Sequence, residues 1–590
     1  MTSVCAFMAA RLREWGVDRV FGIPGRDVDP LVAALTGERN APEFIQARHG
    51  ESAALMACAH AKFTGRVGCC LAPPGSGALH LLSGLYDAAL DRQPVVAVVG
   101  QEPPPAGGGR RQAVGAAHLF AEVSVHCEMV SDPALTGDAL DRALRAAHTE
   151  RGVATLIVPR SVLQAQAPPA PRADDEAASA RARRRPPVRA PGEREVRRAA
   201  EVLNAGRRVA IVVGQGAAEA AGHVVRAAEL LGAGVAKTPL ARDVLPDDLP
   251  CLAGVAAPYG SAVAVALLRD CDTLLLAGAE DFDTGLVADA GTRRVITVDA
   301  GTAPVGLDEP PAVRVTGEVA VALEALIPLL RRASGRGWRT DVERAVRAWR
   351  AEGRSKAHRF FGMVINPRSA VAELSARLPD RAVVVTDSGT ALDWWTRHLE
   401  LRDGMRAALS ARLATPGAAV PYAVAARLAF PGRPVIALIG DGALQSSGMN
   451  ELLTVRRHLE RLAGPPPTIF CVLNNEDLSR LTWERRTAAG DPRIPVTGEV
   501  PAVSYTDYAH LLGLPGVRCE RPGEEGAAWD EALAAEGPLL LEFMVDGDIP
   551  PDWAEFHGPR GARAPSLPHL AGGWLRRRMA ASVGGLFRTG

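Results

Sequence analysis

Lysine is almost absent from this chain of 590 residues. It occurs only at Lys62, Lys237 and Lys356, and arginine supplies the remaining positive charge. Lys+Arg and Asp+Glu both number 67, so the formal net charge is zero and no overall field attracts nucleic acid or an anionic membrane. We therefore expect no nucleic-acid partner, and we interpret the arginine richness as a coding bias.

The chain also lacks paired cysteines and long uninterrupted apolar runs. Its nine cysteines are scattered, and only Cys69 and Cys70 are adjacent. Without a C-x-x-C pair, a disulfide framework or a zinc site is disfavoured, and a reducing cytoplasm is the expected location. The uncharged stretch 251–268 is interrupted at Pro258, which predicts buried core and no membrane span. Residues 1–15 contain no long apolar run, so we expect no signal peptide.

The length and two changes in composition divide the chain into parts. A chain this long does not form a single core. Residues 166–193 are rich in Pro, Ala and Arg and predict a linker, and a second segment, 331–353, is charged and partly helical in pattern. The predicted domains are 1–165, 194–335 and 354–550, followed by a C-terminal tail, 551–590.

All three parts alternate short β-branched runs with longer helical patterns, which is typical of parallel α/β sheets. The predicted strands are Pro42–Gln46, Val67–Leu71, Val95–Val99, Arg208–Val213, Thr273–Leu276, Arg294–Val298, Ala382–Thr386, Pro434–Ile439 and Thr468–Leu473. The expected fold class is therefore α/β, with three consecutive doubly wound parallel-sheet domains. In the second domain, Gly214-Gln215-Gly216 follows a strand, but Glu219 stands where a dinucleotide fingerprint needs a third glycine, so we favour a tight turn over nicotinamide binding.

The third domain carries the strongest functional pattern. Gly440-Asp441-Gly442 directly follows one apolar strand, and Asn474-Asn475 ends the next. In a parallel sheet both turns lie at the carboxyl edge, where open α/β sheets bind ligands. Asp441 and Asn475 offer the hard oxygens that Mg²⁺ prefers, and the glycines allow a diphosphate to approach the backbone.

These residues resemble the binding motif of enzymes that depend on thiamine diphosphate (ThDP), specifically the pyruvate oxidase and acetolactate synthase type. The stretch 474–484 is similar to bacterial ThDP-requiring, pyruvate oxidase-like proteins. The resemblance implies that Mg²⁺ is bound by Asp441, the Asn475 side chain and the backbone carbonyl of Asp477. The other residues it assigns to the cofactor in this domain are Gly440, Gly442, Ala443 and Leu478.

The resemblance extends over nearly the whole chain. Residues 20–25, 61–65 and 80–88 resemble the family's pyrimidine-binding domain, and 239–247 its central domain. By resemblance, the three domains are thus pyrimidine-binding, central and diphosphate-binding. In the family the cofactor lies between the first domain of one subunit and the third of another, which implies a homodimer or a homotetramer.

The part of the motif that activates the cofactor departs from the family. The family places a glutamate after a histidine, where its carboxyl group hydrogen-bonds the aminopyrimidine ring. Here the sequence is His49-Gly50-Glu51, and an ungapped count back from 61–65 puts Gly50 in the glutamate's column. Glu51 is the displaced candidate. If Gly50 is the true column, Gly50→Glu is expected to restore the hydrogen bond.

Three further positions differ. Pro416 replaces a bulky apolar residue, often Met, that wedges under the cofactor in the family. The turn with Gly75 and Gly77 reads Pro-Pro-Gly-Ser-Gly where the family usually has Ser-Gly-Pro-Gly. Gln112 falls where the family often has a glutamine near the reaction centre, but its neighbours are unlike the family.

The resemblance implies an enzyme that decarboxylates a small 2-oxo acid such as pyruvate and then carries out carboligation or oxidation. The altered positions keep open an alternative from another class, a catalytically degenerate ThDP-binding assembly or regulatory subunit. FAD binding is also open: related central domains bind it, but the acidic run at 280–283 disfavours a flavin diphosphate nearby.

Overall fold

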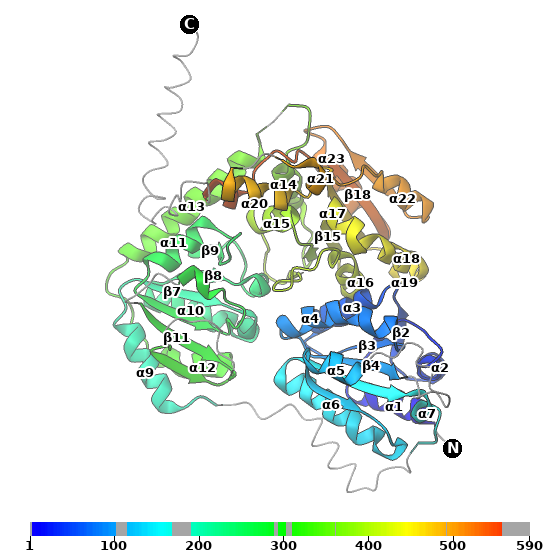
Figure 1. Cartoon of the computed structure of the whole chain (residues 1–590). Helices are drawn as coiled ribbons and strands as arrows, with labels where there is room; N and C mark the ends of the chain where they lie inside the picture. Colours follow the sequence, from blue (N-terminus) through cyan, green and yellow to red (C-terminus); the bar gives the residue numbers. More distant parts are fainter. Residues whose placement is uncertain are drawn as a thin grey trace.

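The computed structural model describes residues 3–101, 115–167, 190–287, 293–301, 310–359, 362–490 and 493–556. Gln112, most of the predicted linker and residues 557–590 lie outside this part of the chain. Within it are three six-stranded sheets whose paired strands run parallel. Helices cover the sheets, and the three sheet domains lie side by side (Figure 1). The predicted fold class is confirmed.

The first domain is built on a sheet of order β2-β1-β3-β4-β6-β5. Its strands are β1 (Arg19–Gly22), β2 (Glu43–Gln46), β3 (Gly68–Ala72), β4 (Val95–Gln101), β5 (Ser124–Met129) and β6 (Val153–Pro159). Its helices are α1 (Val4–Glu14), α2 (Asp29–Gly37), α3 (Gly50–Thr64), α4 (Ser76–Leu90), α5 (Ala116–Ala121), α6 (Thr136–Glu150) and α7 (Arg160–Leu163).

The central domain has the strand order β12-β11-β10-β7-β8-β9. Its strands are β7 (Val209–Val213), β8 (Gly234–Lys237), β9 (Leu252–Val255), β10 (Thr273–Ala277), β11 (Arg294–Asp299) and β12 (Val313–Thr316). Its helices are α9 (Glu193–Asn204), α10 (Ala221–Leu231), α11 (Ala262–Asp270) and α12 (Val319–Leu326). The charged segment 331–353 lies mostly in α13 (Gly337–Ala357), in keeping with its partly helical pattern, and buries Val342, Ala345 and Val346.

The third domain has the strand order β14-β13-β15-β16-β18-β17. Its strands are β13 (Val383–Thr386), β14 (Arg406–Ala408), β15 (Val435–Gly440), β16 (Thr468–Asn474), β17 (Gly516–Cys519) and β18 (Pro538–Met544). Its helices are α14 (Pro367–Arg377), α15 (Thr390–His398), α16 (Ala419–Ala429), α17 (Asp441–Ala443), α18 (Met449–Arg457), α19 (Leu459–Leu462), α20 (Ser479–Ala489), α21 (Pro495–Gly498), α22 (Tyr505–Leu511), α23 (Glu525–Leu533) and α24 (Asp552–Phe556).

All nine strands predicted from the sequence are present, and every boundary lies within one residue of the prediction except the end of β4, which is two residues later. They were recognisable because both faces of each sheet are buried, which makes the strands continuous apolar runs. In β4, Val95 and Val99 join one buried cluster while Val96 and Val98 join another. Among the described residues, no helix is long and apolar enough to cross a membrane.

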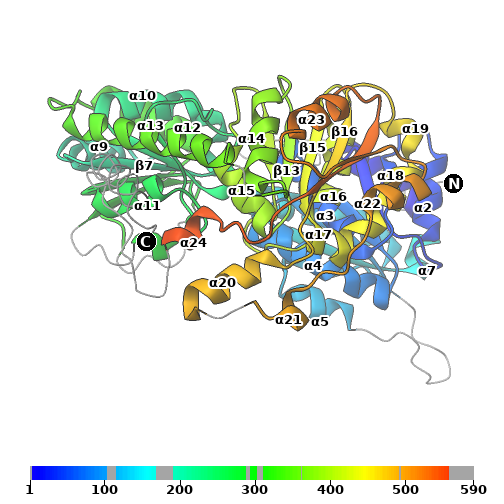
Figure 2. The ribbon, with the colours of Figure 1, turned by 90° about the horizontal axis from the view of Figure 1, so that it is seen from above.

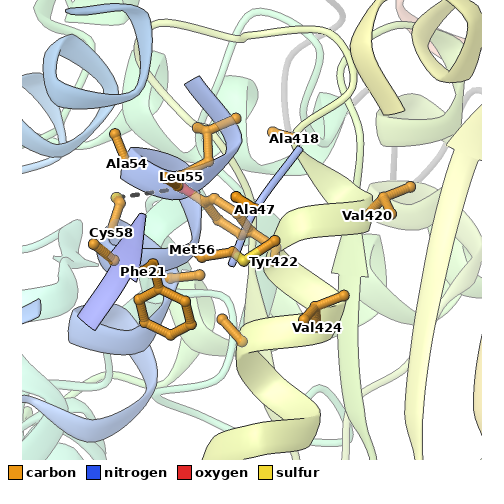
Figure 3. Packing of buried hydrophobic residues seen from close by; sticks show 14 of the residues in the cluster. Phe21, Ala47, Ala54, Leu55, Met56, Cys58, Ala418, Val420, Tyr422 and Val424 are labelled. Atoms are coloured by element: carbon orange, nitrogen blue, oxygen red, sulfur yellow. Dashed lines mark hydrogen bonds between the residues drawn. The ribbon is translucent and has the colours of Figure 1, made fainter. Parts of the chain in front are cut away.

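One hydrophobic cluster is shared by the first and third domains. Helices α3 and α16 pack face to face, and the cluster runs from Phe21 and Met56 on one side to Tyr422 and Val424 on the other (Figure 3). Both helices are rich in alanine, so their backbones approach closely. Figure 2 shows α3 and α16 at the junction of the two domains. This packing fixes the first domain against the third within one chain.

A buried polar cluster, which we call the Lys62 cluster (Lys62, Asp87, Asp91 and Tyr422), lies beside this apolar contact. The Lys62 ammonium donates to Asp91 Oδ2 at 2.7 Å, to the Leu409 carbonyl at 2.6 Å and to Tyr422 Oη at 2.7 Å. Tyr422 in turn donates to Asp87. Burial alone would lower the pKa of Lys62, but the charges of Asp87 and Asp91 more than offset it and the pKa is raised. All three N–H donors of the charged Lys62 ammonium are therefore used within this buried cluster.

We expect Lys62→Met to destabilise the chain strongly, because it leaves two buried carboxyl groups without their cation. Breaking a buried ion pair in this way costs about 3–5 kcal/mol. The matched control is Arg66→Met, near the end of the same helix, where the arginine side chain is 59% exposed and its ion pair with Asp18 should contribute little. Calorimetry should show a melting temperature several degrees lower for Lys62→Met alone; equal melting of the two variants would contradict the assignment.

Candidate active site

Three turns meet at the carboxyl edge of the third sheet. They follow the neighbouring strands β13, β15 and β16 and contain Asp387, Asp441 and Asn475 respectively. The predicted meeting of the turns at Asp441 and Asn475 is therefore present in the structure. Asp387, with Ser388 and Gly389 at the start of α15, was missed from the sequence, although it repeats the pattern of an aspartate directly after a buried strand.

The Asp441 carboxylate is nearly buried and is held by backbone N–H groups. Oδ1 accepts from Gly442 at 2.8 Å, and Oδ2 accepts from Asn475 at 3.1 Å and from Glu476 at 2.6 Å. Burial raises the pKa of Asp441 to about 6, and these hydrogen bonds oppose the rise. Oδ1 accepts only one of these hydrogen bonds and keeps a second acceptor site, so Asp441 can still bind a cation through Oδ1. A divalent cation would compensate the buried charge.

The loop after β16 is folded tightly around Asn475 and Asp477. Asn475 Oδ1 accepts from the Asp477 N–H at 3.1 Å, and its Nδ2 donates to Ser479 Oγ at 2.7 Å. These two hydrogen bonds fix the orientation of the Asn475 side-chain amide, with its oxygen facing the loop. The Asp477 carbonyl accepts from the Ser479 N–H at 2.7 Å, while its carboxylate faces Arg493 at 3.2 Å. The loop that carries the amide and carbonyl oxygens is the same one whose Asn475 and Glu476 N–H groups hold Asp441, and such neutral oxygens suit a metal site of mixed oxygen donors.

The donor set fits a magnesium–diphosphate better than an all-protein metal site. Within the described ranges, no three His, Cys, Asp or Glu side chains gather as metal ligands. A cation beside Asp441 would therefore need neutral protein oxygens and phosphate oxygens, which Mg²⁺ commonly uses. No atom lies within 4 Å of where a Gly440 Cβ would be, which leaves space for a ligand. Gly442 instead contacts Leu478, whose Cδ2 would lie 2.4 Å from an added Cβ. Ala443 completes the turn and is almost buried.

Asp387 organises the segment that carries Pro416. Its carboxylate accepts from the Gly417 N–H at 2.9 Å and from the Ala419 N–H at 3.2 Å. Burial raises the pKa of Asp387 to about 7 against these hydrogen bonds. Pro416 is exposed, and its carbonyl accepts from Ser447 Oγ at 2.9 Å. The predicted wedge position is therefore at the surface of one chain, where a cofactor could reach it.

Ser447 lies in a single π-helical turn, Leu444–Gly448, between the Asp441 turn and α18. Such turns contain one extra residue and often occur at functional sites. Gly417, with φ of +88°, has no room for a side chain against this turn, because an added Cβ would lie 2.1 Å from Ser447 Oγ. The π-turn and the Pro416 segment thus form one packed unit.

The first domain presents a second edge, at the starts of α3 and α4. Gly50 is buried against α4: an added Cβ would lie 2.8 Å from His80 Cβ and 3.0 Å from the Gly77 carbonyl. The expected restoration by Gly50→Glu is therefore not supported, since a glutamate would collide with α4. Glu51 accepts a hydrogen bond from Ser83 Oγ at 2.5 Å, and its other oxygen lies 3.9 Å from His49 Nδ1.

The imidazoles of His49 and His80 stack beside Gly50, with ring centroids 4.3 Å apart. The pKa of His49 is lowered by burial and by His80, and Glu51 opposes this. From the third domain, Glu451 reaches the start of α3 and accepts from the Arg48 and His49 N–H groups at 3.0 and 3.1 Å. This contact was also missed, because 402 residues separate Glu451 from His49.

The turn before α4 retains its glycines in altered form. Gly75 adopts φ of +73° and ψ of −129° at the helix start, a conformation that side chains disfavour. Gly77 packs on Pro73, whose Cγ would lie 2.7 Å from an added Cβ. Pro73 of the altered turn thus occupies the space beside Gly77.

In the central domain, the turns after β7 and β10 touch each other. The Gly216 N–H donates to the Gly278 carbonyl at 3.0 Å, and an added Cβ on Gly214 would lie 2.0 Å from the same oxygen. Gln215 is bound to Gln93 of the first domain at 2.8 Å. These strands flank the point where strand order reverses, which is where dinucleotides bind in such sheets. Here the glycines serve close packing.

Comparison with known proteins agrees with this geometry. Three models of the thiamine pyrophosphate enzymes match the chain: the N-terminal TPP binding domain at residues 2–123, the central domain at 196–326 and the C-terminal TPP binding domain at 387–543. Together they cover more than half of the chain, including the edges at Glu51 and Asp441. The chain therefore belongs to the family of ThDP-dependent enzymes.

Its relatives include a putative thiamine pyrophosphate-containing protein, YdaP, of Bacillus subtilis (strain 168), which is 30% identical over 92% of this chain and 92% of its own length. The pyruvate oxidase of Lactiplantibacillus plantarum is 28% identical over 91% of this chain and 88% of its own length. A probable chloroplastic acetolactate synthase 2 of Oryza sativa subsp. japonica is 30% identical over 90% and 81%. The predicted family is confirmed.

We predict that Asp441→Ala abolishes stabilisation by ThDP with Mg²⁺, because the diphosphate loses the cation that neutralises it. The wild-type melting temperature should rise saturably with ThDP and Mg²⁺ together, as expected for a ligand that binds only the folded state. Asp507→Ala, which removes an exposed carboxylate in the same domain, is the control and should behave as wild type. An unchanged shift in Asp441→Ala would show that the cofactor binds elsewhere.

Proposed function

We propose that this protein is a ThDP- and Mg²⁺-dependent enzyme that decarboxylates a small 2-oxo acid, such as pyruvate, and passes the product on by carboligation or oxidation. The observation that carries the proposal is the meeting of Asp441 with the loop Asn475–Asp477 at one sheet edge, in a chain of this family. The names of the relatives, pyruvate oxidase and acetolactate synthase, support the substrate class.

In this proposal the third domain holds the cofactor's diphosphate. Asp441, the Asn475 amide and the Asp477 carbonyl bind Mg²⁺, and N–H groups at the start of α15 and in the turn Gly440–Ala443 bind phosphate oxygens. Gly440 leaves the backbone open on that side. Bound ThDP would act as the electron sink for loss of CO₂, and the protein would supply orientation and polarity.

The first domain of a second copy would hold the aminopyrimidine ring, so the functional unit is a homodimer or a homotetramer. Glu51 is the only carboxylate in the first turn of α3, and Ser83 fixes its orientation. We propose that Glu51 holds the proton at the pyrimidine ring, one position along from the family's glutamate. The exposed Pro416 of the third domain would pack against the cofactor at the position of the family's wedge residue.

A second candidate function is a ThDP-binding assembly or regulatory subunit with little activity. The specific observation in its favour is Gly50, which stands in the column of the family's glutamate. Gly50 packs so tightly on His80 and Gly77 that a glutamate side chain would not fit there. In this case Glu51 would serve only to complement the positive end of the α3 dipole. The two functions differ in whether bound cofactor is activated.

For FAD, the contact between Gly214 and Gly278 supports the flavin-free alternative, because a diphosphate between β7 and β10 would need these turns to separate. Carboligation to a second carbonyl is then the favoured outcome. The absorbance and mass of small molecules released from the purified protein decide this directly: ThDP without flavin is the expected result.

The enzyme proposal is tested by incubating the protein with ThDP, Mg²⁺ and pyruvate. CO₂ release well above that of free cofactor is expected, with the acceptor product identified by mass spectrometry. If ThDP binds but neither CO₂ nor product forms with a panel of small 2-oxo acids, the assembly-subunit alternative replaces the enzyme.

The role of Glu51 is tested by hydrogen–deuterium exchange at C2 of bound ThDP. Glu51→Gln keeps the shape but removes the carboxylate, and it should slow exchange roughly 10²–10⁴-fold, the usual contribution of a general acid–base group. Glu150→Gln, an exposed change in the same domain, should leave exchange unchanged. Exchange that is fast in wild type and equally fast in Glu51→Gln would exclude Glu51 from proton handling.

A further inference from the structure

A cavity of about 60 Å³ lies where the central domain meets the third domain. Its walls come from β9, from α13 and from the end of α15, and it shares no residue with the edge that carries Asp441. Arginines dominate its lining. They are Arg242, Arg350, Arg354 and Arg397, and we call this site the arginine cavity.

The charges around the arginine cavity do not balance. Only two carboxylates, Asp247 and Glu400, line it against the four arginines. Asp247 is already committed: it accepts from Lys237 Nζ at 2.8 Å, from Arg242, and from the Leu401 N–H at 2.7 Å. Glu400 is exposed to solvent, as is Arg354, and even with both counted in full the arginines outnumber the carboxylates by two. The lining is therefore net positive and favours an anion.

Two of the arginines have unused capacity. Among the described residues, Arg350 donates only to backbone carbonyls, including that of Leu249 at 3.0 Å. The Arg354 side chain forms no hydrogen bond or ion pair with any residue in the described part of the chain, whereas its backbone carbonyl accepts from the His358 N–H. They are four residues apart on α13 and so face the same side. Arg397, by contrast, is held by Asp552 and lies 4.0 Å above the ring of Trp349.

Neutral polar groups complete the lining. Thr396 and His398 line the arginine cavity and are 6% and 8% exposed. Thr396 Oγ1 and His398 Nε2 are buried and have no hydrogen-bond partner among the described residues. Burial, assisted by Arg397, lowers the pKa of His398 well below its ordinary value, so the imidazole is neutral and can donate one hydrogen bond. Buried groups of this kind normally have partners.

The volume suits a small oxyanion. One water needs about 10–15 Å³ of such space, so the cavity has room for four to six heavy atoms, as in a tetrahedral oxyanion. Planar guanidinium groups pair well with phosphate oxygens. We propose that the arginine cavity binds a phosphoryl group, either of inorganic phosphate or of a phosphate monoester, independently of the ThDP site. Because α13 spans the two domains, an occupant would strengthen their junction.

The test is thermal unfolding of the full chain at constant ionic strength, with phosphate exchanged for chloride. Wild type should show a saturable rise in melting temperature. In Arg354→Gln the apparent Kd for phosphate should weaken about 10-fold or more, as expected for loss of a charge-assisted hydrogen bond. Arg347→Gln, an exposed arginine on α13 outside the cavity, is the control and should retain wild-type affinity. Since Arg354 is exposed, its substitution should leave folding intact.

The same titration with and without saturating ThDP and Mg²⁺ separates this site from the proposed active site, because the phosphate effect should persist in both. Adenosine monophosphate is the second probe: a lower Kd than that of inorganic phosphate identifies a monoester as the occupant, and a higher one identifies phosphate. The proposal is overturned if neither probe raises the melting temperature, or if Arg354→Gln responds as strongly as Arg347→Gln.

Discussion

The contact between α3 and α16 is the constraint on which the rest of the structure depends. Alanine-rich faces bring the two helices together, and the Lys62 ammonium closes the polar side of the contact with all three of its donors. Asp91, its partner, also accepts from the Ala411 and Arg412 N–H groups at the start of the segment that leads to Pro416. Lys237 and Lys356 are likewise buried and paired with carboxylates, Lys237 beside Asp247 at the contact of the central and third domains.

Because that contact packs the first domain against the third, it sets the relative positions of two edges of the chain. The edge at Asp441 combines a buried carboxylate, an oriented amide, an open glycine and helix starts, which suit the proposed metal–diphosphate site. The pyrimidine edge is built differently, with stacked histidines beside Gly50 and a carboxylate at Glu51. Glu451 ties the edges together inside one chain. Under the proposed function, binding of the cofactor and its activation would therefore depend on different residues.

Much of the fold was predictable from the sequence because buried parallel strands are continuous apolar runs and their turns carry the polar residues. The pattern Gly440–Gly442 followed by Asn475 is local, and the structure brings these residues together as expected. Asp387 follows the same rule and could have been found. Glu451, the packing of Gly50 on α4 and the contact of Gly214 with Gly278 join residues distant in sequence, and no local pattern predicts them. Gln112 lies outside the described residues, so its place near the reaction centre stays a prediction.

The central claim is that the edge at Asp441 is a working metal–diphosphate site despite the altered pyrimidine edge. Equilibrium dialysis of the wild-type chain against ThDP, with Mg²⁺ and with a chelator, tests it most directly. The account predicts one ThDP retained per chain when Mg²⁺ is present and almost none in the chelator. Failure to retain ThDP with Mg²⁺, or equal retention in the two conditions, would contradict it.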